Sequence, residues 1–221
     1  MSSNTFLLTL LCVVMVGCTT VKHQPLPTHT LSTIKASSIT HTLREKPDFL
    51  AASAGKAILG FVGAVAMISA GNTIIRENNV PDPANYISEN LVSQLAKKYQ
   101  LTLTDNRHKI TTEEDVAKLA EQYSEADLVL DIDSILWGYQ YYKRNPSYYY
   151  MLYNAKIQLI NTPSKQVLAE GLCSYKQDDF STALTLDQLL ANDAEQFKLE
   201  FQKAAEYCLD YFSKKVLRLQ P

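Results

Sequence analysis

The sequence has no excess of charge of either sign and only seven glycines and four histidines. Its 21 Lys and Arg residues are balanced by 23 Asp and Glu residues, for a formal net charge of −2. Proteins that bind nucleic acid carry a basic surface, so we expect no nucleic-acid partner. Nucleophile-elbow and phosphate-binding glycine motifs are also missing, and no two histidines have metal-ligand spacing. These absences favour a non-catalytic protein without metal or cofactor over an enzyme.

The hydrophobic run at the amino terminus is short. Residues 6–16 form an apolar core that cannot span a bilayer but has the length found in secretory signal peptides. We therefore assign residues 1–17 to a signal peptide and exclude them from the fold. Residues 18–35 contain two prolines, five threonines after Cys18 and little hydrophobic pattern, which predicts a flexible tether. Residues 36–221 suit one domain with a core of its own.

The residues just before and at Cys18 resemble a known processing motif. The sequence Met-Val-Gly-Cys at positions 15–18 resembles the lipobox of bacterial lipoproteins, although the family prefers Leu where Met15 stands. The resemblance implies that Cys18 becomes the acylated first residue of the mature protein and holds it at a membrane without a span of its own. Thr19, in place of Asp, implies the outer membrane, facing the periplasm. The alternative is a plain secretory signal followed by an ordinary cysteine.

The sequence has only four cysteines, and we expect two of them to be unavailable for a disulfide bond within the domain. Cys12 is lost with the signal peptide and Cys18 carries the lipid, so Cys173 and Cys208 are the remaining thiols of a protein in an oxidising compartment. Both occupy apolar positions in their predicted elements. We expect a Cys173–Cys208 disulfide, and the alternative is two buried free thiols.

Residues 57–75 contain no charge and are flanked by Lys56 and Arg76. Read as a helix, this segment places small residues near one line, a pattern that lets another backbone come close. They are Ser53, Ala57, Gly60, Ala64 and Gly71. The favoured interpretation is a tightly packed buried helix. Membrane insertion, self-association or a strand are the alternatives.

The rest of the chain alternates between helical and strand patterns. Helices are predicted from Asp82-Pro83 to Tyr99, at 116–123 and at about 192–217, because apolar residues recur every three or four positions. Strands are predicted at 38–43, 101–104, 126–141, 148–160 and 166–175. The pattern predicts an α+β fold, with a mainly antiparallel sheet of about four to five strands and helices on its apolar face.

The two long strands, 126–141 and 148–160, predict a hairpin with a definite register. Their apolar faces coincide when Asp133 lies opposite Lys156 and Asp131 lies opposite Gln158. The two aspartates lie two positions apart and face the same way, as a metal site or an acid and base pair requires. The register favours a structural role on the polar face of the sheet instead.

Aromatic residues gather around the same hairpin. The register places Tyr139 opposite Tyr150 and Tyr141 opposite Tyr148 on the face away from the core, close to Trp137. Tyrosine joins a rigid apolar ring to a polar tip, which suits protein interfaces and stacking on glycans. These five residues are therefore the candidate interaction surface, and plain cross-strand aromatic pairing is the alternative.

Four segments resemble a widespread group of uncharacterised bacterial lipoproteins. They are 71–84 with its Asp82-Pro83-Ala84 helix start, 126–131, Trp137-Gly138 and 167–173. The order of helices and strands is also similar to the small α/β domain of envelope-assembly lipoproteins, such as the curli secretion lipoprotein and the lipoproteins that activate penicillin-binding proteins. The resemblance implies a protein of the cell envelope.

Three hypotheses for function follow from these patterns. We expect a lipid-anchored, non-catalytic interaction or assembly factor, which binds envelope proteins or a second copy of itself. The alternative is a module that binds peptidoglycan or another glycan through its tyrosines. The third hypothesis is an envelope hydrolase in which Asp131 takes part.

Overall fold

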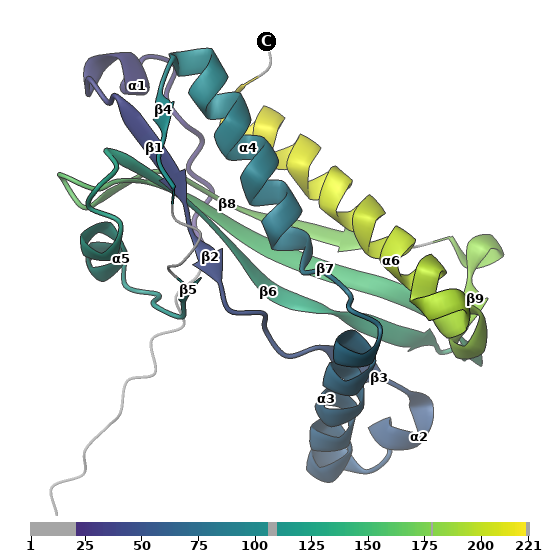
Figure 1. The fold of residues 1–221 in the computed structure, drawn as a ribbon. Coiled ribbons are helices and arrows are strands. Elements are labelled where there is room, and N and C mark those ends of the chain that lie inside the picture. Colours follow the sequence, from purple (N-terminus) through teal and green to yellow (C-terminus); the bar gives the residue numbers. More distant parts are fainter. Residues whose placement is uncertain (1–20, 106–109, 178, 220–221) are drawn as a thin grey trace, which may run out of the picture.

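A computed structural model describes residues 21–105, 110–177 and 179–219 of the chain. The signal peptide and the lipidation residue Cys18 lie outside the described residues. The helices are α1 (Thr30–Thr33), α2 (Ala54–Ala57), α3 (Gly60–Glu77), α4 (Pro83–Tyr99), α5 (Val116–Gln122) and α6 (Leu186–Tyr211). A 3-10 turn at Phe180–Thr182 precedes α6, and a π-helical turn at Phe212–Val216 follows it. The fold is α+β (Figure 1).

Three long strands form the centre of the sheet. These are β6 (Leu128–Tyr142), β7 (Asn145–Asn161) and β8 (Gln166–Lys176), joined as antiparallel neighbours. The short strands β1 (Ser38–His41), β3 (Leu50–Ala52), β4 (Thr102–Leu103) and β9 (Leu184–Thr185) complete a seven-stranded sheet. A separate two-stranded sheet pairs β2 (Leu43–Arg44) with β5 (Ile110–Thr111).

The sheet is mixed, so the prediction of a mainly antiparallel sheet was wrong. Both β1 and β3 run parallel to β6, and β1 also runs parallel to β4. Parallel neighbours need a crossover connection, and here α3 and α4 lie between β3 and β6 in the chain. The hairpins could be predicted from adjacent segments, whereas these crossovers join strands far apart in the sequence.

Helices α4 and α6 cover one face of the central strands (Figure 1). Helix α4 begins where the sequence predicts, because the Asp82 carboxylate accepts a hydrogen bond from the amide of Ala84. Helix α6 begins earlier than predicted, at a capping box formed by Thr185 and Gln188. Asn192, the predicted start, instead lies at a kink where three consecutive residues have positive φ.

A β-bulge divides β6 into two halves. Asp131 lies opposite Gln158 and Asp133 opposite Lys156, as predicted. The register then shifts between Ser134 and Leu136, which leaves Ile135 unpaired and 50% exposed. An extra residue in one strand exchanges the inward and outward positions beyond it.

The bulge overturns the predicted tyrosine pairs. Tyr139 lies opposite Met151 instead of Tyr150, and Tyr141 lies opposite Tyr149 instead of Tyr148. The hairpin is also tighter than the predicted strands 126–141 and 148–160 imply, because Tyr142 pairs with Asn145.

The segment predicted as a free tether lies against the domain from Gln24 onward. Gln24 forms a β-bridge with Glu170, and the amide of Leu26 donates to the carbonyl oxygen of Val216 at 2.7 Å. Leu26 and Leu31 are buried in the main core, with exposed fractions of 2% and 5%. Apolar residues at these two positions anchor the segment, so the prediction of a tether up to residue 35 was wrong.

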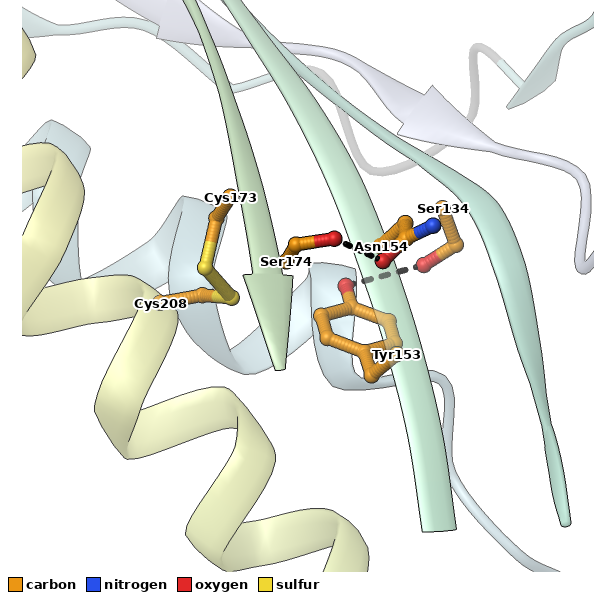
Figure 2. Close-up of a disulfide and its surroundings, with 6 residues drawn as sticks. All are labelled: Ser134, Tyr153, Asn154, Cys173, Ser174 and Cys208. Atoms are coloured by element: carbon orange, nitrogen blue, oxygen red, sulfur yellow. Dashed lines mark hydrogen bonds between the residues drawn. A yellow bond between two sulfur atoms is a disulfide. The ribbon is translucent and has the colours of Figure 1, made fainter. Parts of the chain in front are cut away.

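The predicted Cys173–Cys208 disulfide is present and joins β8 to α6. Figure 2 shows this bond with two hydrogen bonds between neighbouring strands, Tyr153 with Ser134 and Ser174 with Asn154. Both cysteines are buried, with exposed fractions of 1% and 0%. The disulfide therefore fixes the last helix against the edge strand of the sheet.

We expect the Cys173→Ala, Cys208→Ala double variant to lose about 4 kcal/mol of unfolding free energy, because the bond closes a loop with a sequence separation of 35. Urea denaturation of the oxidised proteins measures this. The control is Ser174→Ala, on the exposed face of the same strand, with an expected change of less than about 1 kcal/mol. Equal stability of the double variant and the control would contradict the prediction.

His41 predicts a pH dependence of stability. Burial lowers its pKa, and the charge of Glu89 offsets part of that effect. The unfolded chain therefore takes up this proton at a higher pH than the folded chain. The contribution to stability is complete above the ordinary pKa of about 6.5 and is lost as the pH falls below it.

We expect the unfolding free energy of the wild-type protein to decrease between about pH 7.5 and about pH 5.5, and that of His41→Gln to decrease less. Urea titrations at intervals across this range measure how the unfolding free energy of each protein changes with pH. An equal pH dependence in both proteins would show that His41 does not cause it.

Candidate functional site

Asp131, the candidate acid, forms a buried ion pair with Arg44. The Arg44 Nε donates to Oδ1 of Asp131 at 2.8 Å, and Nη2 donates to Oδ2 at 2.7 Å. The hydroxyl of Thr42 donates a third hydrogen bond to Oδ1, also at 2.7 Å. The side chains of Arg44 and Asp131 are only 6% and 0% exposed. Arg44 on β2 thus reaches across to β6 and satisfies both carboxylate oxygens, a partner that sequence analysis missed.

Asp133 occupies a different environment from Asp131. Burial raises the pKa of its carboxyl, and the nearby guanidinium of Arg44 opposes this rise. Asp133 lines a shallow pocket with Arg44 and Glu114. The two aspartates thus lie on the same side of β6. Only Asp131 forms the hydrogen-bonded ion pair with Arg44, and only Asp133 lines the pocket.

This arrangement does not resemble a hydrolytic centre. A carboxylate that is 0% exposed and held by a buried arginine is out of reach of a substrate, so it is poorly placed to act as a catalytic acid or base. Among residues 21–105, 110–177 and 179–219, no group of three or more His, Cys, Asp or Glu side chains could hold a metal ion. The geometry therefore favours the structural interpretation of Asp131.

Two of the five predicted surface aromatics belong to the core. Trp137 and Tyr139 are 0% and 3% exposed. The Trp137 ring packs 5.1 Å from that of Phe49, and its Nε1 donates to the carbonyl oxygen of Pro47 at 3.0 Å. Burial raises the pKa of Tyr139 to about 12. The bulge at Ile135 turns both side chains inward, so their assignment to a surface was wrong.

The other predicted aromatics lie partly exposed near the end of the hairpin. Tyr141, Tyr148 and Tyr150 are all intermediate in burial. Tyr150 lies against Tyr142, with ring centroids 4.8 Å apart, and its hydroxyl donates to the side-chain oxygen of Gln140 at 2.7 Å.

Phe180 joins these tyrosines into one cluster. Its ring centroid lies 4.9 Å from that of Tyr142 and 5.6 Å from that of Tyr148. The guanidinium of Arg144 stacks on the Phe180 ring, 3.4 Å from the centroid. We call Tyr142, Arg144, Tyr148, Tyr150 and Phe180 the aromatic surface. No sequence pattern connected Phe180 with the hairpin, because its 3-10 turn lies beyond β8.

Most of the segment 57–75 belongs to α3, whose two halves have different surroundings. Gly63, Met67, Gly71 and Ile75 form its buried face, which differs from the predicted line of small residues. A Cβ atom at Gly71 would collide with the carbonyl oxygen of Phe49, so glycine permits the close backbone approach that small residues predict. The carboxyl-terminal half of α3 is therefore held against β3.

The amino-terminal half of α3 carries large apolar side chains exposed to solvent. We call the residues around the α2–α3 turn the apolar tip: Ile58 (84% exposed), Leu59 (59%), Phe61 (84%), Val62 (70%) and Val65 (54%). Gly60 turns the chain here with a φ of +56°. No helix in the described part of the chain is long and apolar enough to cross a membrane. The favoured interpretation, a tightly packed buried helix, therefore fails for the amino-terminal half of the segment, while one face of α3 is buried.

Comparisons with known proteins give distant similarities only. No family model matches the chain, and no curated protein is significantly similar to it in sequence. Lipoprotein GNA1162 from Neisseria meningitidis is similar over 64% of this chain and 83% of its own, with 18% identity and a TM-score of 0.27. The hypothetical protein CT253 from Chlamydia trachomatis is similar over 81% and 98%, with 10% identity and a TM-score of 0.41.

PelC from Paraburkholderia phytofirmans, solved as a dodecamer, is similar over 91% of this chain and 99% of its own. Its sequence identity is 11% and its TM-score is 0.37. With all three TM-scores below 0.5, these similarities establish neither a family nor a function for this chain.

The ion pair predicts unequal effects at neighbouring aspartates. We expect Asp131→Asn to lower the unfolding free energy by about 3 to 5 kcal/mol, because it leaves the buried Arg44 charge without its partner. Asp133→Asn, two residues along the same strand, serves as the control, with an expected change of less than about 1 kcal/mol. Urea denaturation of both variants tests this. Equal losses of unfolding free energy would show that the Arg44–Asp131 pair stabilises the fold no more than Asp133 does.

Proposed function

We propose that this chain is a lipid-anchored protein of the bacterial cell envelope, which acts without catalysis by binding another protein. The proposed anchor is Cys18, in the outer membrane with the domain facing the periplasm, and it rests on the lipobox-like sequence. The proposed binding site is the aromatic surface, and it rests on the geometry at the end of the β6–β7 hairpin.

The observation that carries the binding site is the composition and rigidity of the aromatic surface. Aromatic residues and arginine are enriched at protein interfaces, where they supply most of the binding energy. Here the rings of Tyr142, Tyr148 and Tyr150 are held by Phe180, by each other and by hydrogen bonds. The Tyr142 hydroxyl, for example, donates to the carbonyl oxygen of Gln177 at 3.3 Å. Preordered side chains lose little conformational entropy on binding, which favours affinity.

The same geometry favours a protein partner over a glycan. Stacking on a sugar requires an aromatic ring with an open face. One face of Phe180 is covered by the Arg144 guanidinium, and the ammonium group of Lys176 lies 5.0 Å from the centroid of Tyr150. These cations compete with a sugar for the ring faces, whereas at a protein interface they add polar contacts around an aromatic centre.

A hydrolase receives no support from the described residues. Asp131 is fully buried in its ion pair with Arg44, and Asp133 lines a shallow pocket together with both cationic and anionic side chains.

Chemical crosslinking in intact cells tests the proposed binding site. We expect the wild-type protein to yield a discrete crosslinked species, either with another envelope protein or with a second copy, identified by mass spectrometry after mild detergent extraction. The Tyr148→Ala, Tyr150→Ala variant should lose that species, because it removes two rings of the aromatic surface.

The matched control is Tyr207→Ala, which removes a 50% exposed tyrosine on α6, far along the chain from the hairpin. It should retain the crosslinked species. An uncrosslinked monomer in wild type and variants alike, or equal loss in the control, would refute the aromatic surface as the binding site.

A further inference from the structure

The apolar tip is an exposed hydrophobic feature of the described chain that the proposed function does not use. Five large side chains, each more than half exposed, lie within eight residues of one another. Figure 1 shows α2 and α3 projecting from one end of the molecule, beyond β3. Soluble surfaces rarely carry a contiguous group of this kind without a binding role.

The arrangement of these side chains fits a helix that lies on a lipid surface. Ile58 and Leu59 occupy the turn, and Phe61, Val62 and Val65 fall within about 100° of one another around the start of α3. A helix that lies in a membrane interface presents one apolar face of this kind to the lipid. The buried seam of Gly63, Met67 and Gly71 is already occupied by the rest of the domain.

The charges around the tip also suit a lipid surface. No acidic residue occurs between Asp48 and Glu77, and the two charged residues in that interval, Lys56 and Arg76, are basic. Lys56 lies directly before the tip, where its side-chain nitrogen donates to the carbonyl oxygen of Ala66 at 3.2 Å. A basic residue beside an inserted apolar group lies at the depth of anionic headgroups.

The position of the amino terminus limits how far the domain can stand from the membrane. Gln24 is fixed to Glu170, so only six peptide steps separate the domain from Cys18. Fully extended, six residues span roughly 20 Å. If Cys18 is acylated, as the proposed function holds, Gln24 lies within roughly 20 Å of the bilayer surface.

We propose that the apolar tip inserts into the lipid surface to which the protein is anchored, as a second membrane contact that does not span the bilayer. This inference rests on the proposed lipid anchor. The acyl chains hold the protein at the membrane, and the tip fixes the orientation of the domain there. The aromatic surface then faces its partner in a defined direction.

Tryptophan fluorescence of the mature acylated protein, which begins at Cys18, tests this insertion. The protein is reconstituted into vesicles of phosphatidylcholine and phosphatidylglycerol, with or without bromine on the acyl chains as a quencher. F61W places an indole at the apolar tip, and I110W places one at a site on β5 that is 70% exposed. The native Trp137, which is 0% exposed, supplies the same background in every sample.

We expect the added emission of F61W to shift to shorter wavelength and to lose most of its intensity in brominated vesicles, while that of I110W does neither. Adding Val62→Asp to F61W should abolish the shift and the quenching, with an unchanged near-ultraviolet circular dichroism spectrum. Quenching of F61W no stronger than that of I110W would overturn the proposal.

A separate measurement distinguishes failure of the proposed lipid anchor from failure of the proposed tip insertion. Wild type should incorporate labelled palmitate in cells, and Cys18→Ser should not. If neither protein is labelled, the lipid anchor is refuted, and quenching of F61W by added vesicles alone then decides whether the tip inserts.

Discussion

The close fit of β3 between α3 and β6 is the constraint on which the rest of the structure depends. The carbonyl oxygens of Phe49 and Leu50 lie where Cβ atoms of Gly71 and Gly138 would be, so both neighbours must be glycine. This approach seats the Phe49 ring in the core, where its centroid lies 5.1 Å from that of Trp137 and 5.7 Å from that of Phe201. One short strand thereby joins the projecting helix to the sheet and to α6.

Local features were predictable from the sequence, and distant pairings were not. Asp82-Pro83 specifies the start of α4 by itself, and the disulfide follows from two cysteines at buried positions. The Arg44–Asp131 pair joins residues 87 positions apart, and nothing beside either residue indicates the other. The parallel pairing of β1 and β3 with β6 is equally distant in sequence, which is why the sheet was predicted as mainly antiparallel.

The aromatic surface could not be predicted correctly because a single residue, Ile135, shifts the register of β6. The alternation in β6 continues without an obvious break through Ile135, since both neighbouring positions are compatible with a strand. The bulge nevertheless sends Trp137 and Tyr139 into the core and leaves Tyr150 outside. The hairpin was therefore identified correctly, but its aromatic residues could not be divided between the interior and the surface. Phe180 and Arg144 complete the cluster through contacts that only the tertiary structure reveals.

The contact between Leu26 and Val216 also has a consequence for the order in which the chain folds. A ribosome makes residue 26 almost two hundred residues before residue 216, whose carbonyl oxygen accepts its hydrogen bond. Likewise, β1 and β3 are made well before β6, their shared neighbour. A nascent chain thus exposes its apolar segment 57–75 throughout the synthesis of β6, β7 and β8. Topologies with such distant pairings fold slowly, because their contacts form only after long loops have closed, and the unfolded chain exposes apolar surface in the meantime.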